Sequence, residues 1–373
     1  MAVYYFLFAV ILLQMILEPI AKKYKFEEKS PFWYDLIFKE KYLICFLFIL
    51  FATIRGNSVG GDNGNYIKYY NACKNGEYIF DFEIGYGYLN IILAKLGLPI
   101  NALWLVIAFF TMYAFKKLID TYCKDNQYIP YLLFLSLGLY AQMLGLYRQI
   151  IALDFCLLGL CSLKNNKYFE FVWFVLMSSM FHLSGLLGFV LLIPKIIKFD
   201  FKTCIISFLI LTILGVFFIE FLQLLEMIIP NFHYYSQYVV QNQLYGGYFL
   251  DIPYTIGLAG ILVFLIIIYF GYKNKYSKEE YKNFSYFLIL YIIYFYTKLL
   301  GVAYGFEALF NRISIMFYFS IIILPTFVEK AIGRFRLRKW YQIAIIIVAF
   351  CYMTYLIKYK GSCGVYPYTF MKI

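Results

Sequence analysis

Charged residues are scarce in this chain. Only 14% of its 373 residues are Asp, Glu, Lys or Arg, whereas 63% are hydrophobic and the mean hydropathy is +0.73. A soluble globular domain has about 25% charged and about 45–50% apolar residues, so the apolar excess is too large for a water-soluble core. With roughly 20 apolar residues needed for each membrane crossing, the sequence predicts an all-α polytopic integral membrane protein with about twelve transmembrane helices.

The signatures of several function classes are missing. The chain has no GxxxxGK[ST] loop and no run long enough for a cytosolic domain, which argues against ATP or a nucleotide sugar as substrate. It has two His and eight Cys, without a CxxC motif or the Cys/His spacing of a metal site. We therefore expect no metal and no other cofactor. Cys73 and Cys363 fall on the same predicted outer side, and a disulfide between them is left open.

The net charge of +12 comes from Lys and Arg residues in short blocks between apolar runs. Cytoplasmic loops of membrane proteins are enriched in Lys and Arg, so these blocks predict membrane orientation and do not indicate nucleic-acid binding. With the blocks in the cytoplasm, both termini lie outside. The expected organisation is a single transmembrane domain over residues 1–373, with loops 56–82 and 223–253 on the outer face.

Two apolar segments are too long for one membrane crossing and too short for two. Residues 84–115 are interrupted at Gly97-Leu98-Pro99, which predicts a re-entrant or broken helix over residues 84–100 before a full crossing. Residues 168–197 are too long for one crossing and short for two, so we expect a helical break near His182. Re-entrant backbone is tolerated only where protein or a water-filled cavity covers it. By contrast, residues 129–163 read as a plain hairpin and residues 311–328 as one crossing.

Three of the six Arg residues, Arg55, Arg148 and Arg312, fall at the predicted outer ends of crossings, against the positive-inside trend. For any single one of these arginines, contact with lipid phosphates explains the position as well as a functional role does. Three such residues from separate parts of the chain favour a shared site. A guanidinium binds phosphate oxygens in pairs and stays charged when it is desolvated, so a cavity with these residues suits a diphosphate.

Candidate acid–base residues accompany the arginines. Asp62 lies in a glycine-rich loop and Glu83 at the start of the re-entrant segment. A turn-forming aspartate and a carboxylate that complements a helix dipole explain these two equally well. His182 lies in an apolar stretch, where a polar side chain is costly and often functional, although a lone His can also be a packing residue. His233, in the long loop, is expected to be a surface residue.

Six short motifs follow one another between about residues 50 and 330. They are Ile54–Gly56, Val59–Tyr66, Glu83–Tyr88, Tyr147–Ala152, Phe181–Ser184 and Asn311–Ile313. In this order they resemble the EpsG/Wzy-type bacterial polysaccharide polymerases, which build O-antigen, capsule or exopolysaccharide. Asn63-Gly64 after Asp62 departs from the more hydroxyl-rich stretch expected of such proteins.

The resemblance implies a glycosyl transfer on the periplasmic side of the bacterial inner membrane. A growing glycan on undecaprenyl diphosphate would pass to the non-reducing end of a lipid-linked repeat unit, with inversion and without a metal. The expected partners are the lipid bilayer and the undecaprenyl-diphosphate-linked oligosaccharide, with a chain-length regulator protein as a further candidate and no nucleic acid.

Three groups of residues receive expected roles in this reaction. The cations that stabilise the leaving diphosphate are Arg55, Arg148 and Arg312. The acid–base residues are His182, favoured as the base, with Glu83 and Asp62 as base or as residues that orient it. The residues expected to contact substrate are Tyr66, Tyr86, Tyr147 and Gln149.

Other functions stay open. An O-antigen ligase-like transferase would use the same donor chemistry with another acceptor. A flippase for lipid-linked oligosaccharides also fits many crossings and a cationic cavity, but its cavity must open to both sides, whereas the candidate residues gather on one side. A structural scaffold is the alternative without chemistry.

Overall fold

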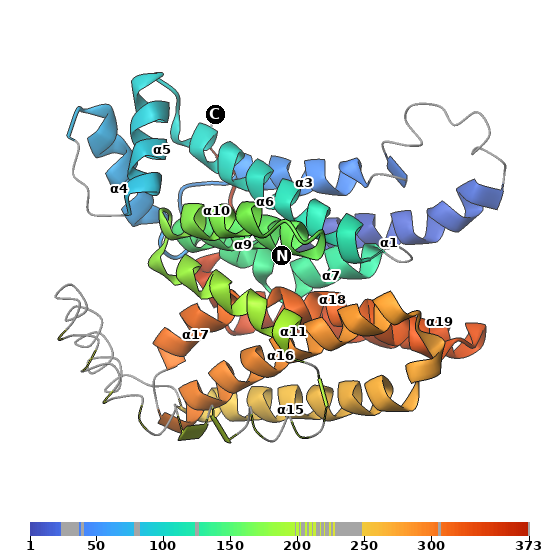
Figure 1. Ribbon diagram of the computed structural model, residues 1–373. Coiled ribbons are helices and arrows are strands. Elements are labelled where there is room, and N and C mark those ends of the chain that lie inside the picture. Colours follow the sequence, from blue (N-terminus) through green and yellow to red (C-terminus); the bar gives the residue numbers. More distant parts are fainter. Residues whose placement is uncertain are drawn as a thin grey trace. The chain divides into compact units, whose positions relative to one another are not determined.

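The computed structural model is all-helical (82% helix), with no strand in the part of the chain that it describes (Figure 1). It describes residues 1–23, 37–38, 41–77, 83–123, 127–197, 199–200, single residues between 202 and 227, 248–304 and 307–371. Contacts divide the chain into two compact units. Unit 1 comprises Met1–Leu186 and Arg334–Ile373, and unit 2 comprises Leu187–Gly333. The single transmembrane domain stays a prediction.

Helices account for nearly all of both units. Those of unit 1 are α1 (Ala2–Lys23), α3 (Tyr42–Thr53), α4 (Asn63–Lys74), α5 (Ile84–Lys95), α6 (Ile100–Tyr122), α7 (Tyr128–Ser136), α8 (Leu139–Met143), α9 (Tyr147–Lys164), α10 (Tyr168–Ser179) and α19 (Phe335–Thr354). Those of unit 2 are α11 (Ile193–Ile196), α15 (Tyr248–Gly271), α16 (Lys278–Tyr304), α17 (Glu307–Ile315) and α18 (Phe319–Ile332). The 3-10 helix η2 (Leu183–Leu192) begins in unit 1 and ends in unit 2.

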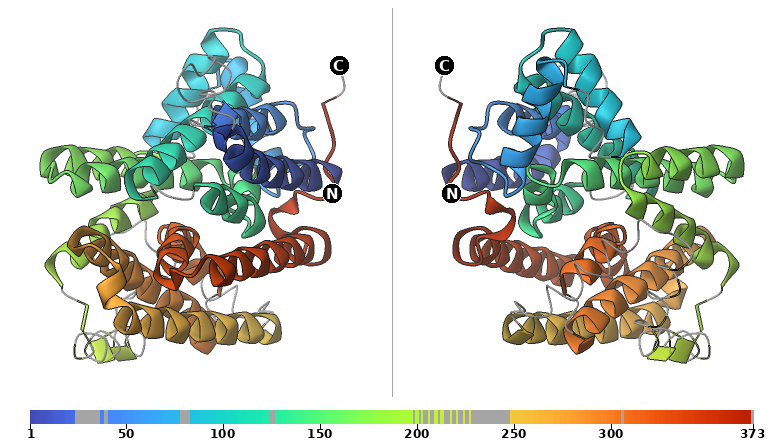
Figure 2. Two further views of the ribbon diagram at one scale, coloured as in Figure 1. Left: turned by 90° about the vertical axis from the view of Figure 1, so that its right-hand side faces the viewer. Right: turned by 90° about the vertical axis from the view of Figure 1, so that its left-hand side faces the viewer.

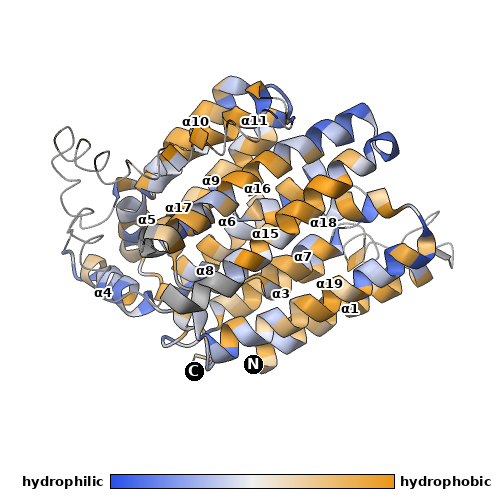
Figure 3. Cartoon of the chain, turned by 90° about the horizontal axis from the view of Figure 1, so that it is seen from below, coloured by the Kyte–Doolittle hydropathy of each residue, from blue (hydrophilic) through white to orange (hydrophobic). Residues whose placement is uncertain are grey.

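Five described helices are long and apolar enough to cross a membrane. They cover Ala2–Ala21, Ile100–Tyr122, Tyr254–Gly271, Lys278–Ala303 and Phe335–Tyr359. Three shorter apolar helices cover Tyr42–Thr53, Tyr168–Ser179 and Leu183–Ile196. A 12-residue helix rises only about 18 Å, less than the apolar core of roughly 30 Å, so the predicted number of about twelve crossings is not confirmed. Figure 3 shows the contrast between the apolar α16 and the hydrophilic α4.

Both predicted helix breaks are present. Gly97, with φ +72°, turns the chain between α5 and α6, a conformation that glycine adopts without strain. Helix α10 ends at Ser179 and η2 begins at Leu183, so His182 lies in the turn between them.

Two further breaks contradict the sequence-based predictions. Gly138, with φ +92°, separates α7 from α8, so the predicted hairpin over residues 129–163 contains three helices. The crossing predicted over residues 311–328 is divided into α17 and α18 by turns at residues 316–318. The predicted loop 223–253 ends earlier than expected, because α15 begins at Tyr248. His233 lies outside the described residues.

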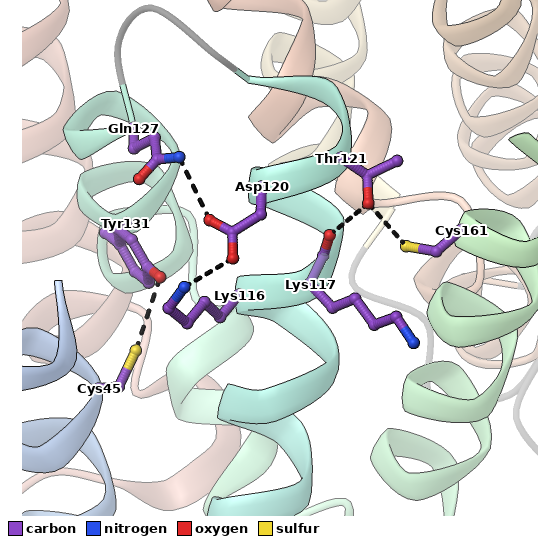
Figure 4. Close-up of polar contacts among 8 residues, drawn as sticks. All are labelled: Cys45, Lys116, Lys117, Asp120, Thr121, Gln127, Tyr131 and Cys161. Atoms are coloured by element: carbon purple, nitrogen blue, oxygen red, sulfur yellow. Dashed lines mark hydrogen bonds and ion pairs between the residues drawn. The ribbon is translucent and has the colours of Figure 1, made fainter. Parts of the chain in front are cut away.

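Helices α3 and α6 run between two chemically different ends of unit 1. Lys116 Nζ lies 5.2 Å from the ring of Tyr42, and Asn101 Nδ2 donates a 2.8 Å hydrogen bond to the Thr53 carbonyl, so α3 and α6 are antiparallel. Figure 4 shows the lysine end, where Asp120 accepts hydrogen bonds from Lys116 and the nearby Gln127 at 2.6 and 3.2 Å. The opposite end of unit 1, beyond Thr53, is called the arginine end below. It is the predicted outer end, because the lysines are predicted to be cytoplasmic.

The start of α1 and residues 363–371 lie at the arginine end, and Figure 2 shows them side by side, in dark blue and red. The Tyr4 hydroxyl donates to the Val365 carbonyl at 3.0 Å. Residues 363–371, the C-terminal segment, run antiparallel to residues 54–61. The backbone N–H groups of Gly56 and Gly61 donate to carbonyls of this segment, both at 2.7 Å.

The glycine-rich loop has a packing role that explains its composition. A Cβ at Gly60 would lie 2.2 Å from the Leu144 carbonyl oxygen, and φ is +111° there. A Cβ at Gly364 would lie 2.9 Å from Gly61 Cα. Only glycine permits such an approach of backbone to backbone. These residues therefore bring the loop, the C-terminal segment and the end of α8 together.

Candidate functional site

Buried aromatic rings form the core of the arginine end. The rings of Tyr66 and Tyr147 stack with 4.4 Å between centroids, and Tyr66 meets Tyr86 edge-on at 5.5 Å. These rings come from α4, α9 and α5, so they hold the α4–α5 pair against the start of α9. All three tyrosines and the neighbouring Gln149 are at most 4% exposed. In this structure the four residues expected to contact substrate are therefore occupied with packing.

Arg55 is enclosed in this core. Its side chain is 1% exposed and lies over the ring of Trp104, with 4.3 Å from Cζ to the ring centroid. The guanidinium donates hydrogen bonds to the Ala52 carbonyl and, at 2.5 Å, to the Tyr147 hydroxyl. Among the described residues no carboxylate pairs with it. The Nε of Arg55 has no hydrogen-bond partner among the described residues. A guanidinium covered in this way acts on its neighbours and does not face a bound ligand here.

The hydrogen-bond chain continues from Arg55 into α4. The Tyr147 hydroxyl donates to Asn63 Oδ1 at 2.5 Å, and Asn63 Nδ2 donates to the Asn57 carbonyl at 2.9 Å. Asn63 departs from the expected hydroxyl-rich stretch. Its side chain makes both of these hydrogen bonds and is fully buried. The adjacent Asp62 is exposed at the start of α4.

Arg148 and Glu83 form the ion pair of the arginine end. Arg148 Nη1 lies 2.5 Å from Glu83 Oε2, and the two side chains are 25% and 20% exposed. Arg148 is in the first turn of α9, one residue after Tyr147, while Glu83 directly precedes α5. Burial raises the pKa of Tyr66 above its ordinary value, and the positive charge of Arg148 opposes that shift. Arg148 therefore brings positive charge to a partly open position beside the aromatic core.

Glu83 also joins this pair to the break at His182. Its Oε1 accepts a hydrogen bond from the Leu183 backbone N–H at 3.4 Å. The N–H of Gly85 donates to the Met180 carbonyl at 2.8 Å, and a Cβ at Gly85 would approach that oxygen to the same distance. The start of α5 therefore docks directly on the turn between α10 and η2.

The ring of His182 is oriented by Ser184. His182 Nδ1 lies 2.7 Å from the Ser184 hydroxyl and accepts a hydrogen bond from the Ser184 N–H at 3.2 Å. An accepting Nδ1 carries no proton, so the neutral ring carries its proton on Nε2. This tautomer suits His182 as a hydrogen-bond donor through Nε2.

The remaining predicted arginine lies in unit 2. Arg312 is exposed on α17. Beside it in sequence, Asn311 accepts a hydrogen bond from Lys298 Nζ of α16. The same α16 holds Tyr294, whose hydroxyl lies 2.6 Å from that of Tyr254 on α15. Unit 2 thus has its own polar group, built from three helices.

Two ionisable residues inside apolar helices, Asp154 and Lys298, were not among the predicted site residues. Asp154 is 1% exposed, and its Oδ2 accepts a 2.6 Å hydrogen bond from the Thr111 hydroxyl. Its Oδ1 has no hydrogen-bond partner among the described residues. The available signal was their position, because ionisable residues within membrane helices are rare and often functional.

The structure gives no support for a resident metal in its described part. No group of three or more His, Cys, Asp or Glu residues there could hold a metal ion. Cys73 and Cys363 are free thiols. Burial raises the pKa of the Cys363 thiol above its ordinary value, which favours the neutral form.

The comparisons with known proteins agree with the motifs of the sequence. The model of the EpsG family matches residues 41–370, a range that includes both the arginine end of unit 1 and the polar group of unit 2. Among curated proteins and among solved structures, nothing matches the chain significantly.

Proposed function

The chain belongs to the EpsG family, a family of polysaccharide polymerase-like membrane proteins, and from this premise we propose that it polymerises lipid-linked repeat units. In this proposal it is a glycosyltransferase of the bacterial inner membrane with its site on the periplasmic side. It transfers a growing glycan from undecaprenyl diphosphate to a lipid-linked repeat unit, with inversion and without a metal.

The Arg148–Glu83 pair beside His182 is the observation that carries the proposal. Three segments that are far apart in the chain meet there, and both members of the pair are partly open to the surroundings. An arginine at such a position can exchange a carboxylate for the oxygens of a diphosphate, to which its guanidinium binds in the same geometry.

This exchange suggests how the reaction begins. Without donor, Glu83 neutralises Arg148. When the donor binds, its diphosphate takes the place of the carboxylate on Arg148, and Glu83 is released to accept a proton. Glu83 then removes the proton of the acceptor hydroxyl as that oxygen bonds to the anomeric carbon from the opposite face. The bond from the anomeric carbon to the phosphate oxygen breaks, and Arg148 stabilises the negative charge on the departing lipid diphosphate.

The other predicted site residues take supporting roles in this proposal. His182 donates a hydrogen bond through Nε2 to a substrate oxygen, which leaves the base to Glu83, with the exposed Asp62 as the second candidate base. Arg312, which belongs to unit 2, stays a predicted diphosphate-binding cation. Arg55 is a positioning residue, because it fixes Tyr147 and thereby the turn that carries Arg148.

The alternatives differ in acceptor or in transport. An O-antigen ligase-like transferase would also bind the donor diphosphate through Arg148 but would transfer the glycan to another acceptor. A flippase would move the lipid across the membrane without forming a glycosidic bond. The family description favours the polymerase. A chain-length regulator protein stays a candidate partner.

The test is an assay with purified protein in liposomes and its undecaprenyl-diphosphate-linked repeat unit, with products resolved on a gel. We expect a polymer ladder from the wild type. Arg148→Ala is expected to lower the rate by roughly 10²–10³-fold, the usual loss for one transition-state donor. Lys68→Ala, which removes an exposed cation from the nearby α4, is the matched control and is expected to keep the ladder.

Each other outcome has a defined meaning. Equal ladders from wild type and Arg148→Ala would contradict the role of Arg148. Transfer to a lipid A core acceptor without any ladder would identify a ligase. Movement of the lipid-linked unit across the liposome membrane without transfer would identify a flippase.

A further inference from the structure

Helix α5 exposes a continuous apolar stripe along one side. Its members recur every four residues and are 50–67% exposed: Ile84, Tyr88 and Ile92 of the helix, and Leu96, which directly follows it. Residues four apart are neighbours on a helix surface. At 3.6 residues per turn, the four side chains form a continuous ridge that winds gradually around the helix. The opposite face of α5 is buried against the aromatic core, through residues such as Tyr86 and Ile91.

The stripe is not explained by a membrane crossing. From Ile84 to Leu96 the backbone rises about 18 Å, which is short of the roughly 30 Å apolar core of a bilayer. Helix α6, with 23 residues, is long and apolar enough to be a candidate crossing. It has its own exposed apolar residues at the same spacing, Leu105, Phe109 and Tyr113. The α5 stripe belongs to a short helix between the hydrophilic α4 and the turn at Gly97.

The stripe begins at the ion pair. Ile84 directly follows Glu83, whose carboxylate lies 2.5 Å from Arg148 Nη1. The partly open guanidinium of Arg148 therefore contacts the residue that directly precedes the first member of the stripe, and the stripe itself is apolar. This arrangement complements an amphiphile whose anionic head is joined directly to a long hydrocarbon chain.

We propose that the exposed stripe of α5 binds the polyprenyl chain of the lipid-linked donor, with the diphosphate on Arg148. The inference rests on the proposed function for its ligand class. The chain lies along the stripe from Ile84 towards Leu96, so the isoprenoid units nearest the diphosphate contact Ile84 and Tyr88, and later units contact Ile92 and Leu96. Packing of the isoprenoid units against these apolar side chains favours the long-chain donor.

The direction of the chain gives the proposal a sharp test. The assay compares donors that carry the same repeat unit on undecaprenyl diphosphate or on the much shorter farnesyl diphosphate. The double variant Ile92→Ala/Leu96→Ala is expected to raise the KM for the undecaprenyl donor roughly tenfold, from the lost apolar contact, and to leave the KM for the farnesyl donor unchanged. Ile84→Ala is expected to raise both.

The matched control is Leu105→Ala/Phe109→Ala on α6, which removes exposed apolar side chains at the same spacing and is expected to change neither KM. All replacements are at exposed positions and introduce alanine, a strong helix former. Equal KM changes for the α5 and α6 variants, or equal changes for both donors in Ile92→Ala/Leu96→Ala, would overturn the proposal.

A second measurement separates this inference from the proposed function. Farnesyl diphosphate with a photoreactive group at its far end is cross-linked to the wild type in liposomes, and the labelled peptides are identified by mass spectrometry. Labelling of α5 that excess undecaprenyl diphosphate suppresses supports the inference even if no polymer forms. Labelling spread equally over α5 and α6 contradicts it, even if polymer forms.

Discussion

Exchanging the two charges of the Arg148–Glu83 pair separates a structural ion pair from a substrate-binding one. The perturbation is the double variant Arg148→Glu/Glu83→Arg, compared with Arg148→Ala alone. The two charges in the double variant can still attract each other across α5 and α9. A diphosphate would then meet a carboxylate at position 148 in place of a guanidinium.

The structure sets the size of the effect on stability. The two side chains are 25% and 20% exposed, so the pair is neither a surface pair nor a fully buried one. Surface pairs contribute about 0–1 kcal/mol, and breaking a buried pair costs about 3–5 kcal/mol. We therefore expect Arg148→Ala to lower the free energy of unfolding by about 1–3 kcal/mol and the double variant to recover part of that loss.

Activity is expected to follow a different order. Both variants remove the cation from position 148, so both are expected to lose polymerisation by at least roughly 10²–10³-fold. The double variant also removes Glu83, the proposed base, which adds to its loss of activity. Stability is measured as the thermal unfolding midpoint in detergent, and activity by the polymer ladder. If the double variant recovered activity together with stability, the pair would be structural only, and the reasoning that places the diphosphate on Arg148 would be refuted.

Three further predictions follow from other contacts. Arg55→Ala removes two hydrogen bonds and a stacked cation from the core, so the free energy of unfolding should fall by about 2–4 kcal/mol, measured as a lower thermal midpoint. In Gly60→Ala the new Cβ would lie 2.2 Å from the Leu144 carbonyl at φ +111°, so a loss of about 1–3 kcal/mol and faster proteolysis of the C-terminal segment are expected. Gly64→Ala, where nothing lies within 4 Å, is its control and should leave both unchanged or slightly improved. Lys298→Ala removes the hydrogen bond to Asn311, so a lower thermal midpoint and a roughly tenfold loss of polymerisation are expected. A lower midpoint with unchanged polymerisation would assign this cation of a candidate crossing a structural role.

Local properties of the sequence were sufficient for the class of protein and for several of its elements. An apolar excess of this size can only be buried in lipid, and it identifies a helical membrane protein without any contact being known. The break at Gly97-Leu98-Pro99 and the break around His182 depend on residues next to one another in the chain, and both were predicted. The family motifs are also short and local, and the family is confirmed.

The arrangement of the site was decided by tertiary structure. Arg148 and Glu83 are 65 positions apart, and nothing in their neighbourhoods selects one as the partner of the other. Arg55 and Arg148 looked equivalent as arginines at helix ends. Helix packing encloses Arg55 under Trp104 and leaves Arg148 partly open.

The glycine-rich loop shows the same division. Its composition predicted a turn. Only the fold shows that the C-terminal segment and Leu144 pack against this loop, which is why position 60 requires glycine. Hydropathy and backbone preference act over a few residues, so the sequence by itself determined that the chain enters a membrane as helices and where several of those helices end. Which charges meet, and which remain open to a ligand, depends on contacts between segments far apart in the chain, and only the packed structure decided them.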